Sequence, residues 1–384
     1  MKIAMSSRVY SKKGGVSRYV AELAERFAEE HEVHIFSSKW EDVGNDKIIF
    51  HKTPLPPGPI LVEAGTYFLE MSALSRLMRS RFDIIHTEGL ESAWLDVVTA
   101  HSIHRGAMEA MKCIGELKPI GAMDKFLLAI EKINYQKCRN YRKIICDSSS
   151  SKQELMDFYE VPAEDIAVVP LGVNAEEFKP LDKRSLKPLR DKYGIDDGDL
   201  VLLIVATEFY RKGITELINA VNILINERGY KTIKLLVVGK ARIEGSRKGD
   251  TYYRELAAKL GIAKNVIFTG SASDLNAHYN LGDIFVFPTK YEAFGIPTLE
   301  AMSCGLPVIN SKIGAGELIT DSHDGLLLDD ANNVKEIADK IETLVVDETL
   351  RVNLGENARK TAKKYTWDII ARQTMNVYEE VLRC

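Results

Sequence analysis

Short runs of consecutive apolar residues alternate along this chain with longer segments whose apolar residues recur every three or four positions. A continuous apolar run is typical of a strand buried on both faces, and the longer period is typical of a helix with one buried face. Strands that alternate with helices predict an α/β fold with parallel sheets. The predicted strands are 2–5, 33–36, 83–86, 97–100, 144–146, 200–205, 233–238, 266–268, 284–287 and 308–309, and residues 324–329 are expected to close the second sheet.

This alternation stops near residue 180 and starts again at residue 200, across a polar and charged segment typical of a domain boundary. A chain of 384 residues is also long for a single core. We therefore expect an N-terminal domain of residues 1–174 and a C-terminal domain of residues 175–365. Helices are expected at 65–79, 252–260 and 367–382, and another should open at Gly314.

The stretch from Asp283 to Pro307, DIFVFPTKYEAFGIPTLEAMSCGLP, combines a strand, a polar loop and a short helix. Pro297 is expected at the first helical position, where its missing N–H costs nothing. The first N–H groups of a helix lack internal partners and carry partial positive charge, so they favour phosphate. Two carboxylates, Glu292 and Glu300, flank this helix start and are suited to accept hydrogen bonds from hydroxyls. A ligand with a phosphate group between two polyols is a nucleotide sugar.

The residues EAFGIPTLE, followed by AMSCGLPVI, resemble the retaining glycosyltransferases of family 4, which have the GT-B fold. The resemblance implies two Rossmann-like doubly wound domains that face each other across a cleft, and a C-terminal helix, about 366–384, that crosses back to the N-terminal domain. It also implies that Glu292 contacts hydroxyls of the donor sugar and that Glu300 holds the ribose. The backbone of Phe294, Gly295 and Ile296 would bind the diphosphate and the sugar.

Two cations, Arg211 and Lys212, precede Gly213 at the start of a predicted helix, where positive charge opposes the helix dipole. Their position therefore indicates a nearby anion. Lys212 matches the lysine of the family, and Arg211 is the candidate replacement for its arginine, because Ala206 and Thr207 stand where the family commonly has Gly-Arg. The variant resembles the branch that contains lipopolysaccharide-core glucosyltransferases, which favours UDP-glucose as donor.

Candidate residues of the N-terminal domain lie at its loops and strand ends. Gly14 and Gly15 precede the first helix; in the family such glycines face the cleft, although a turn alone can also require them. His101 ends the strand 97–100, at the edge where ligands of parallel sheets bind. Thr99-Ala100-His101 is similar to a family motif whose histidine lies near the transferred sugar, but Ser102 replaces its usual Asp. We interpret His86, at another strand end, as structural.

Two further donor-binding candidates lie at strand ends of the second domain. Gly239 ends the strand 233–238, and Ser271 belongs to the segment 269–273, which corresponds to the nucleobase site of the family.

The region 105–143 departs from the strand–helix alternation and is rich in methionine and other apolar residues. Across 105–152 the chain has ten Lys or Arg residues against five acidic ones. A cationic amphipathic segment is suited to a membrane surface or to a lipid-linked acceptor. A pair of helices with core-facing apolar sides and solvated outer faces also explains the pattern, so both interpretations stay open.

Composition excludes several classes of function. The net charge of −4 gives no general attraction to nucleic acid. The five cysteines are scattered without C-x-x-C pairs, and no apolar run approaches the roughly 20 residues that span a bilayer. We expect a cytoplasmic protein, at most peripheral at the inner membrane face. No Asp-x-Asp motif accompanies the implied diphosphate, so neither a metal nor a cofactor is expected.

The sequence thus predicts a retaining Leloir glycosyltransferase that moves a hexosyl group, with UDP-glucose as the preferred donor, to a glycan, lipid-linked or small-molecule acceptor. Arg211, Lys212, Glu292 and His101 are the candidate catalytic residues. Three alternatives stay open: a UDP-sugar epimerase of the same fold, a retaining glycoside hydrolase that uses Glu292 and Glu300, and a binding module without activity.

Overall fold

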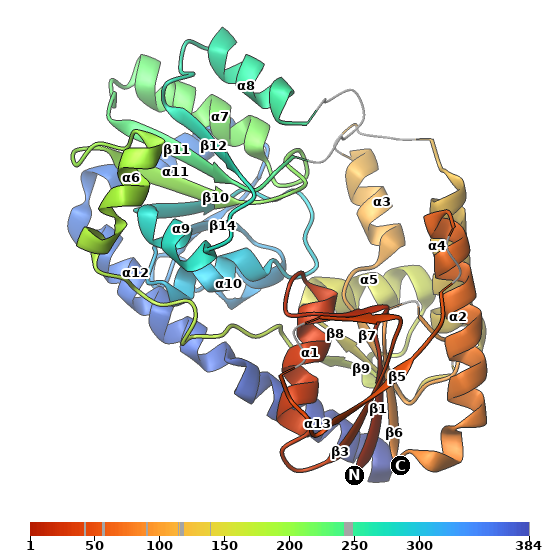
Figure 1. The fold of residues 1–384 in the computed structure, drawn as a ribbon. Coiled ribbons are helices and arrows are strands. Elements are labelled where there is room, and N and C mark those ends of the chain that lie inside the picture. Colours follow the sequence, from red (N-terminus) through yellow and green to blue (C-terminus); the bar gives the residue numbers. More distant parts are fainter. Residues whose placement is uncertain are drawn as a thin grey trace. The chain divides into compact units, whose positions relative to one another are not determined.

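The computed structural model describes residues 1–41, 44–55, 58–89, 91–113, 115, 119–138, 140–241 and 249–383. The chain divides into two compact units. Unit 1 consists of Met1–Gly172 together with Trp367–Cys384, and unit 2 consists of Val173–Thr366. Each unit is built on one parallel sheet with helices on both faces (Figure 1), as the alternation of apolar runs predicts.

The sheet of unit 1 has seven parallel strands in the order β5-β3-β1-β6-β7-β8-β9. Its strands are β1 (Lys2–Ser6), β3 (Glu32–Ser37), β5 (Ile48–Lys52), β6 (Ile84–Glu88), β7 (Val97–Ala100), β8 (Lys143–Cys146) and β9 (Ile166–Val168). Two further strands, β2 (Val9–Tyr10) and β4 (Lys39–Trp40), form a separate parallel pair. The helices are α1 (Val16–Phe27), α2 (Ile60–Leu77), α3 (His104–Cys113), α4 (Ala122–Glu131), α5 (Ser149–Tyr159) and α13 (Trp367–Arg383).

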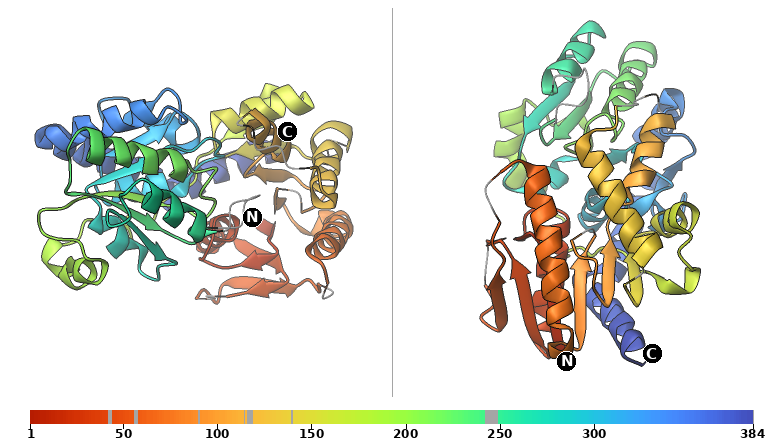
Figure 2. Two further views of the ribbon diagram at one scale, coloured as in Figure 1. Left: turned by 90° about the horizontal axis from the view of Figure 1, so that it is seen from above. Right: turned by 90° about the vertical axis from the view of Figure 1, so that its right-hand side faces the viewer.

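Alternate residues of a strand point to opposite faces of the sheet, and β6 shows which helices cover each face of unit 1. Ile85 belongs to an apolar cluster with Tyr67 and Met71 of α2. The next residue, His86, points the other way and bonds to Tyr378 of α13. The right-hand view of Figure 2 shows α2 lying along one face of this sheet. The C-terminal helix therefore completes the other face of the first unit, together with α1.

The sheet of unit 2 has six parallel strands in the order β12-β11-β10-β13-β14-β15. They are β10 (Leu200–Val205), β11 (Ile233–Val238), β12 (Val266–Gly270), β13 (Ile284–Phe287), β14 (Val308–Ser311) and β15 (Leu326–Leu328). Helices cover both of its faces: α6 (Lys187–Tyr193), α7 (Ile214–Asn222), α8 (Asp250–Lys259), α9 (Leu275–Leu281), α10 (Ile296–Ser303), α11 (Val334–Val346) and α12 (Glu348–Ala362). The central strands β10 and β13 are almost entirely buried, which explains their uninterrupted apolar sequence.

Several expected boundaries are wrong by a few residues. Helix α2 begins at Ile60 rather than Gly65, because Pro59 precedes a run of residues that all tolerate helix. Pro297 occupies the second helical position, since Ile296 already has helical geometry after the left-handed Gly295. Residues Gly314–Leu318 form a short 3-10 turn and do not open an α-helix.

The region 105–143 forms two α-helices, α3 and α4, and a π-helical segment, Lys132–Cys138. The apolar residues Met123, Phe126, Leu127 and Leu128 of α4 are half-buried. Residues 114, 116–118 and 139, which include part of the predicted cationic stretch, lie outside the described residues.

Candidate functional sites at the two switch points

In each sheet the strand order reverses at one place, the switch point. The predicted site residues of each unit lie in loops at strand ends near it. In unit 1 the chain runs from β1 toward β5 on one side and continues with β6 on the other. In unit 2 the strand β10 lies between β11 and β13. Loops at the carboxyl ends of such strands form a crevice, which is the usual ligand site of open α/β sheets.

In unit 1 a cavity of about 710 Å³ opens at this edge of the sheet. Arg8 follows β1, Glu88 and Glu91 belong to the end of β6 and its loop, and His101 follows β7. Phe126 and Leu127 of α4 line the cavity as well. The predicted His101 therefore lies in a concave site large enough for a sugar-sized ligand.

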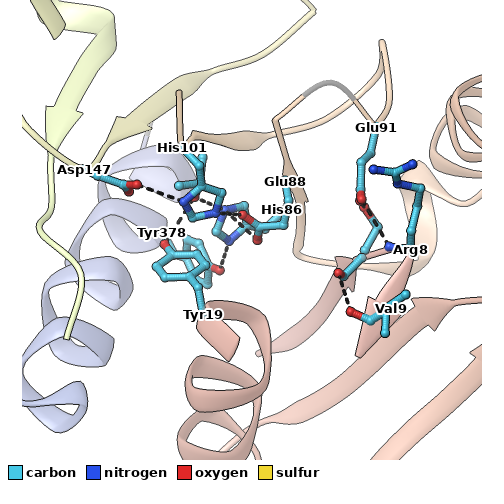
Figure 3. Close-up of polar contacts among 12 residues, drawn as sticks. Arg8, Val9, Tyr19, His86, Glu88, Glu91, His101, Asp147 and Tyr378 are labelled. Carbon is cyan, nitrogen blue, oxygen red and sulfur yellow. Dashed lines mark hydrogen bonds and ion pairs between the residues drawn. The ribbon is translucent and has the colours of Figure 1, made fainter. Parts of the chain in front are cut away.

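His101 lies between two buried carboxylates from the neighbouring strand ends (Figure 3). Its Nδ1 is 2.9 Å from Oδ2 of Asp147, and its Nε2 is 2.8 Å from Oε2 of Glu88. Burial alone would lower the pKa of His101, but Asp147 and Glu88 outweigh it and raise this pKa to about 10. The ring is therefore an imidazolium at neutral pH, with both N–H groups donating to carboxylates.

His86 has a different environment, although it lies on the adjacent strand. It is fully buried, with Nδ1 2.6 Å from the hydroxyl of Tyr378 and Nε2 2.7 Å from Oγ1 of Thr99. Burial, together with the charge of His101, lowers the pKa of His86 to about 3. A neutral imidazole between two hydroxyls links α13 to the sheet, which is a structural role.

Glu91 is a further acidic group of the same cavity (Figure 3). Its carboxylate accepts hydrogen bonds from the hydroxyl of Ser6 (3.0 Å) and from the backbone N–H of Arg8 (3.1 Å). Burial, reinforced by the nearby charge of Glu88, raises the pKa of Glu91 to about 7. Three of the carboxyl groups that line this cavity, those of Glu88, Glu91 and Glu131, therefore have a raised pKa and bind protons more readily than an exposed glutamate does.

In unit 2 the loop after β10 and the loop after β13 bring the predicted cations and Glu292 together. Lys212 forms an ion pair with Oε2 of Glu292, and Nη1 of Arg211 lies 3.7 Å from the same oxygen. Arg211 is held in place by Glu208 and by the carbonyl of Tyr291, 2.7 Å from its Nη1. Glu292 thus occupies the position between two cations that the sequence analysis assigned to a diphosphate.

Lys212 is largely buried, and its ammonium lies 4.9 Å from the centre of the Phe287 ring. Burial, with the neighbouring charge of Arg211, lowers the pKa of Lys212. The charge of Glu208 opposes this lowering, and Glu292 forms the ion pair with the ammonium group. Gly213 holds the two loops close together: its φ is +74°, and a Cβ at this position would overlap with the carbonyl oxygen of Pro288.

The start of helix α10 carries the remaining central candidates. Gly295 has a φ of 90° and directly precedes Ile296, the first helical residue. The carbonyl of Phe294, whose side chain is buried, accepts a hydrogen bond from the N–H of Ala315. Glu300, 4% exposed, accepts a hydrogen bond of 2.8 Å from the hydroxyl of Tyr279. One oxygen of this carboxylate is therefore fixed by the neighbouring helix α9.

The other candidates lie at loops and strand ends. Gly14 and Gly15 are exposed and immediately precede α1. The N–H of Gly239, after β11, donates to the carbonyl of Gly270 at 2.9 Å, which places Gly239 beside the exposed Ser271. The structure thus brings together Arg211, Lys212 and Glu292 in unit 2, and separately groups Gly239 with Ser271.

Models of two families of known proteins match this chain. Residues 13–177 match the model described as Glycosyltransferase Family 4, and residues 187–361 match the model described as Glycosyl transferases group 1. The chain is a family 4 glycosyltransferase. It is therefore a transferase enzyme, and the alternative of a binding module without activity is not supported.

Relatives in sequence extend over the whole of this glycosyltransferase. It is 28% identical to an uncharacterized glycosyltransferase of Methanocaldococcus jannaschii, over 99% of this chain and 98% of the relative. It is 27% identical to the D-inositol 3-phosphate glycosyltransferase of Streptomyces bingchenggensis, over 96% of this chain and 85% of the relative.

Solved structures show the same fold. WaaG, a glycosyltransferase involved in lipopolysaccharide biosynthesis, superposes with a TM-score of 0.77 at 21% identity, covering 98% of this chain and 99% of WaaG. Anabaena Alr3699/HepE in complex with UDP-glucose gives 0.75 at 17% identity, covering 99% and 100% of the two chains. The two Rossmann-like units of the glycosyltransferase are therefore those of the GT-B fold.

The sequence analysis did not predict three residues of the site around His101: Glu88, Asp147 and Glu91. The signal for the first two was present, because both lie at the carboxyl end of an apolar run, as His101 does. Recognising them requires the order β6-β7-β8, which places these three ends side by side. Glu91 lies farther along a loop and carries no such signal.

No helix in the described part of the chain is long and apolar enough to cross a membrane. No group of three or more His, Cys, Asp or Glu side chains in the same part of the chain is arranged to hold a metal ion.

Proposed function

We propose that this family 4 enzyme transfers a hexosyl group from a UDP-sugar, with UDP-glucose as the preferred donor, and that it retains the anomeric configuration. The observation that carries the proposal is the convergence of Arg211, Lys212 and Glu292 at the switch point of unit 2. Retention follows the resemblance of EAFGIPTLE to the retaining family. The UDP and UDP-glucose complexes of HepE, a protein of the same fold, support a uridine nucleotide.

In this proposal the two cations neutralise the diphosphate of the donor. Bond cleavage places a full additional charge on the departing UDP, and preorganised cations stabilise that charge in a water-poor site. Before the donor binds, Glu292 pairs with Lys212 and Glu208 pairs with Arg211; Glu292 then accepts hydrogen bonds from the hydroxyls of the sugar. The start of α10, at Gly295 and Ile296, contributes backbone N–H groups and the positive end of the helix dipole.

Glu300 is the proposed ribose ligand. Its carboxylate is buried and is oriented by the hydroxyl of Tyr279, so one oxygen is already directed by the protein. A carboxylate accepts hydrogen bonds from two vicinal hydroxyls, which ribose offers. Gly239 and Ser271, which lie beside each other at the ends of β11 and β12, are proposed to contact the nucleobase. No step of this proposal requires a metal ion.

The cavity of unit 1 is the proposed acceptor site. Glutamates contribute much of its charge (Glu63, Glu88, Glu91 and Glu131), while Arg8 and Lys39 contribute positive charge. Carboxylates accept hydrogen bonds from hydroxyls, so the cavity suits a polyhydroxylated acceptor. The imidazolium of His101 is proposed to orient Glu88 and Asp147 at the edge that receives the transferred sugar. Gly14 and Gly15 are proposed to let the backbone approach the donor closely.

We further propose a cytoplasmic location, with α3 and α4 as the region of any contact with a membrane or a lipid-linked acceptor. Phe126 and Leu127 of α4 line the acceptor cavity, which connects this region to the site. The family assignment favours transfer over the epimerase and hydrolase alternatives. A hydrolase needs a second carboxylate opposite the first, whereas Glu292 lies beside two cations.

A thermal-shift series tests the donor. UDP-glucose at a hundred times its dissociation constant should stabilise the enzyme by about 2.7 kcal/mol, and GDP- and ADP-sugars at equal concentration should stabilise it less. Product analysis by NMR then follows the anomeric configuration of the transferred sugar. Equal stabilisation by all three nucleotides would refute the uridine assignment, and an inverted product would refute retention.

A further inference from the structure

A second cavity of unit 1, of about 310 Å³, lies away from the acceptor cavity. It is lined by residues of the end of α2 and of the segments that precede β7 and β8: Arg76, Arg79, Trp94, Leu95, Asn140, Tyr141 and Arg142. These segments lead into the amino ends of parallel strands, whereas His101 follows a carboxyl end. The two cavities therefore lie at opposite edges of the sheet, and the proposed glycosyl transfer does not use this one.

The charges around this second cavity are unbalanced. Arg79 forms an ion pair with Oδ1 of Asp96, and Nη1 of Arg142 lies 3.8 Å from the same oxygen. The other oxygen of Asp96 accepts a hydrogen bond of 2.9 Å from the N–H of Ile85. One buried carboxylate thus faces two guanidinium groups.

Arg76 adds a third positive charge that Asp96 does not neutralise. Its guanidinium lies 4.9 Å from the centre of the Trp94 ring, and no carboxylate of the described residues is within ion-pair distance of it. Neutralising Asp96 requires only one arginine, so this structural need does not explain why Arg76 is held at the cavity. Gathering like charges in one concave site is unfavourable unless an anion joins them.

The donors identify the class of anion. Arginine presents a planar set of N–H groups that matches phosphate oxygens, and it stacks on aromatic rings. Asn140 also lines the cavity, and a side-chain amide can donate to such oxygens. The volume exceeds the needs of an inorganic ion and admits a phosphate group with a small organic part.

We propose that this cavity binds the phosphate group of a phosphorylated small molecule or of a lipid headgroup, with Arg76, Arg79 and Arg142 as its cationic ligands. Trp94 covers the organic part next to the phosphate. The site is separate from the donor cations of unit 2, so the proposal does not depend on the proposed function.

Two sources can supply this chemistry. A soluble phosphate monoester enters the cavity from solvent. A phospholipid headgroup enters it only if the surrounding surface reaches the bilayer, and the exposed Leu77, next to Arg76 on α2, would then contact the lipid. The test uses both glycerol 3-phosphate and vesicles.

Titration calorimetry with glycerol 3-phosphate, and flotation with phosphatidylcholine vesicles with and without phosphatidic acid, are performed on the full chain. Arg76→Gln is the test variant, because this arginine does not touch Asp96 and its loss leaves the buried carboxylate paired. Arg372→Gln, an exposed arginine of α13, is the control. Quenching of Trp94, identified by comparison with Trp94→Phe, reports binding at this cavity rather than at Lys212.

We expect Arg76→Gln to weaken binding about tenfold, the loss of one charge-assisted hydrogen bond, while Arg372→Gln binds as the wild type does. Binding of glycerol 3-phosphate assigns the site to soluble phosphate esters, and flotation that requires phosphatidic acid assigns it to lipid. Absence of both, or binding that neither Arg76→Gln nor Trp94→Phe alters, would overturn the proposal.

Discussion

At the scale of single residues, both candidate sites contain charges that are buried together. His101 is held between Glu88 and Asp147, and Lys212 contacts Glu292. Such pairs contribute little net stability when intact, but removing one partner leaves an uncompensated buried charge. Substitutions at these residues therefore report on electrostatics more sharply than on packing.

His101→Asn should lower the free energy of unfolding of unit 1 by about 3–5 kcal/mol, because two buried carboxylates lose their cation. The pKa of His101 is raised from 6.5 to about 10 in the folded state, so its contribution is complete below pH 6.5 and is lost as the pH rises to about 10. Urea unfolding between pH 6 and pH 10 measures this loss. The control is His323→Asn, at an exposed turn. If the free energy of unfolding of His101→Asn still falls with rising pH as that of the wild type does, the imidazolium assignment is refuted.

Glu300→Gln should weaken the binding of UDP about tenfold, because the amide accepts from only one of the two ribose hydroxyls. Its shape is close to that of glutamate, and Tyr279 keeps an acceptor, so the fold should persist. Calorimetry with UDP and with uracil separates the two effects: the binding of uracil should not change. If UDP binds to the variant with wild-type affinity, Glu300 does not hold the ribose.

At the scale of elements, the strands were the most predictable part of the fold. The expected bounds of β7, β10, β11 and β13 agree with the structure, since continuous apolar runs are buried on both faces. The two-residue strands β2 and β4 were missed, because they carry no periodic signal, and the strands β5 and β9 were missed as well. The contact between Lys212 and Glu292 could not be predicted from the sequence either. It depends on the pairing of β10 with β13, which the local pattern of apolar residues does not specify.

Gly213 provides an element-scale test of the contact between the two donor loops. Gly213→Ala should destabilise unit 2 and slow turnover, because its Cβ would force the loop with Lys212 away from Pro288 and thus from Glu292. Gly229→Ala is a matched control: it has a similar positive φ, +83°, but open space around its Cβ. The control should be less stable only by the cost of placing alanine in a left-handed backbone conformation, about 1–2 kcal/mol. Equal losses of stability and activity in both variants would show that the loop contact is unimportant.

At the scale of the whole molecule, the C-terminal helix makes the first unit discontinuous in sequence. The chain leaves unit 1 after Gly172 and returns at Trp367, and a side chain at Gly172 would collide with the Trp367 ring. Tyr378 then joins α13 to His86 in the sheet. The resemblance to the GT-B family predicted this return of the chain, whereas periodicity predicted only an amphipathic helix.

Trp367→Ala should therefore destabilise unit 1 by about 3–5 kcal/mol, the usual cost of removing a buried tryptophan. Trp367 contacts the Tyr19 ring and packs against Gly172, both in unit 1, so calorimetry should show the transition of unit 1 moving to lower temperature while that of unit 2 stays in place. Trp40→Ala, at a partly exposed tryptophan of β4, is the control. A shift of both transitions by the same amount would mean that the two units unfold as one.

Single-turnover release of UDP from UDP-glucose tests whether Lys212 and Arg211 stabilise the departing diphosphate. Lys212→Ala should slow release at least about 100-fold while changing the binding of UDP much less, since its charge matters most as the bond breaks. Lys335→Ala, on the exposed side of α11, should release UDP at the wild-type rate. A Lys212→Ala rate within about twofold of wild type would show that Lys212 does not stabilise the departing diphosphate.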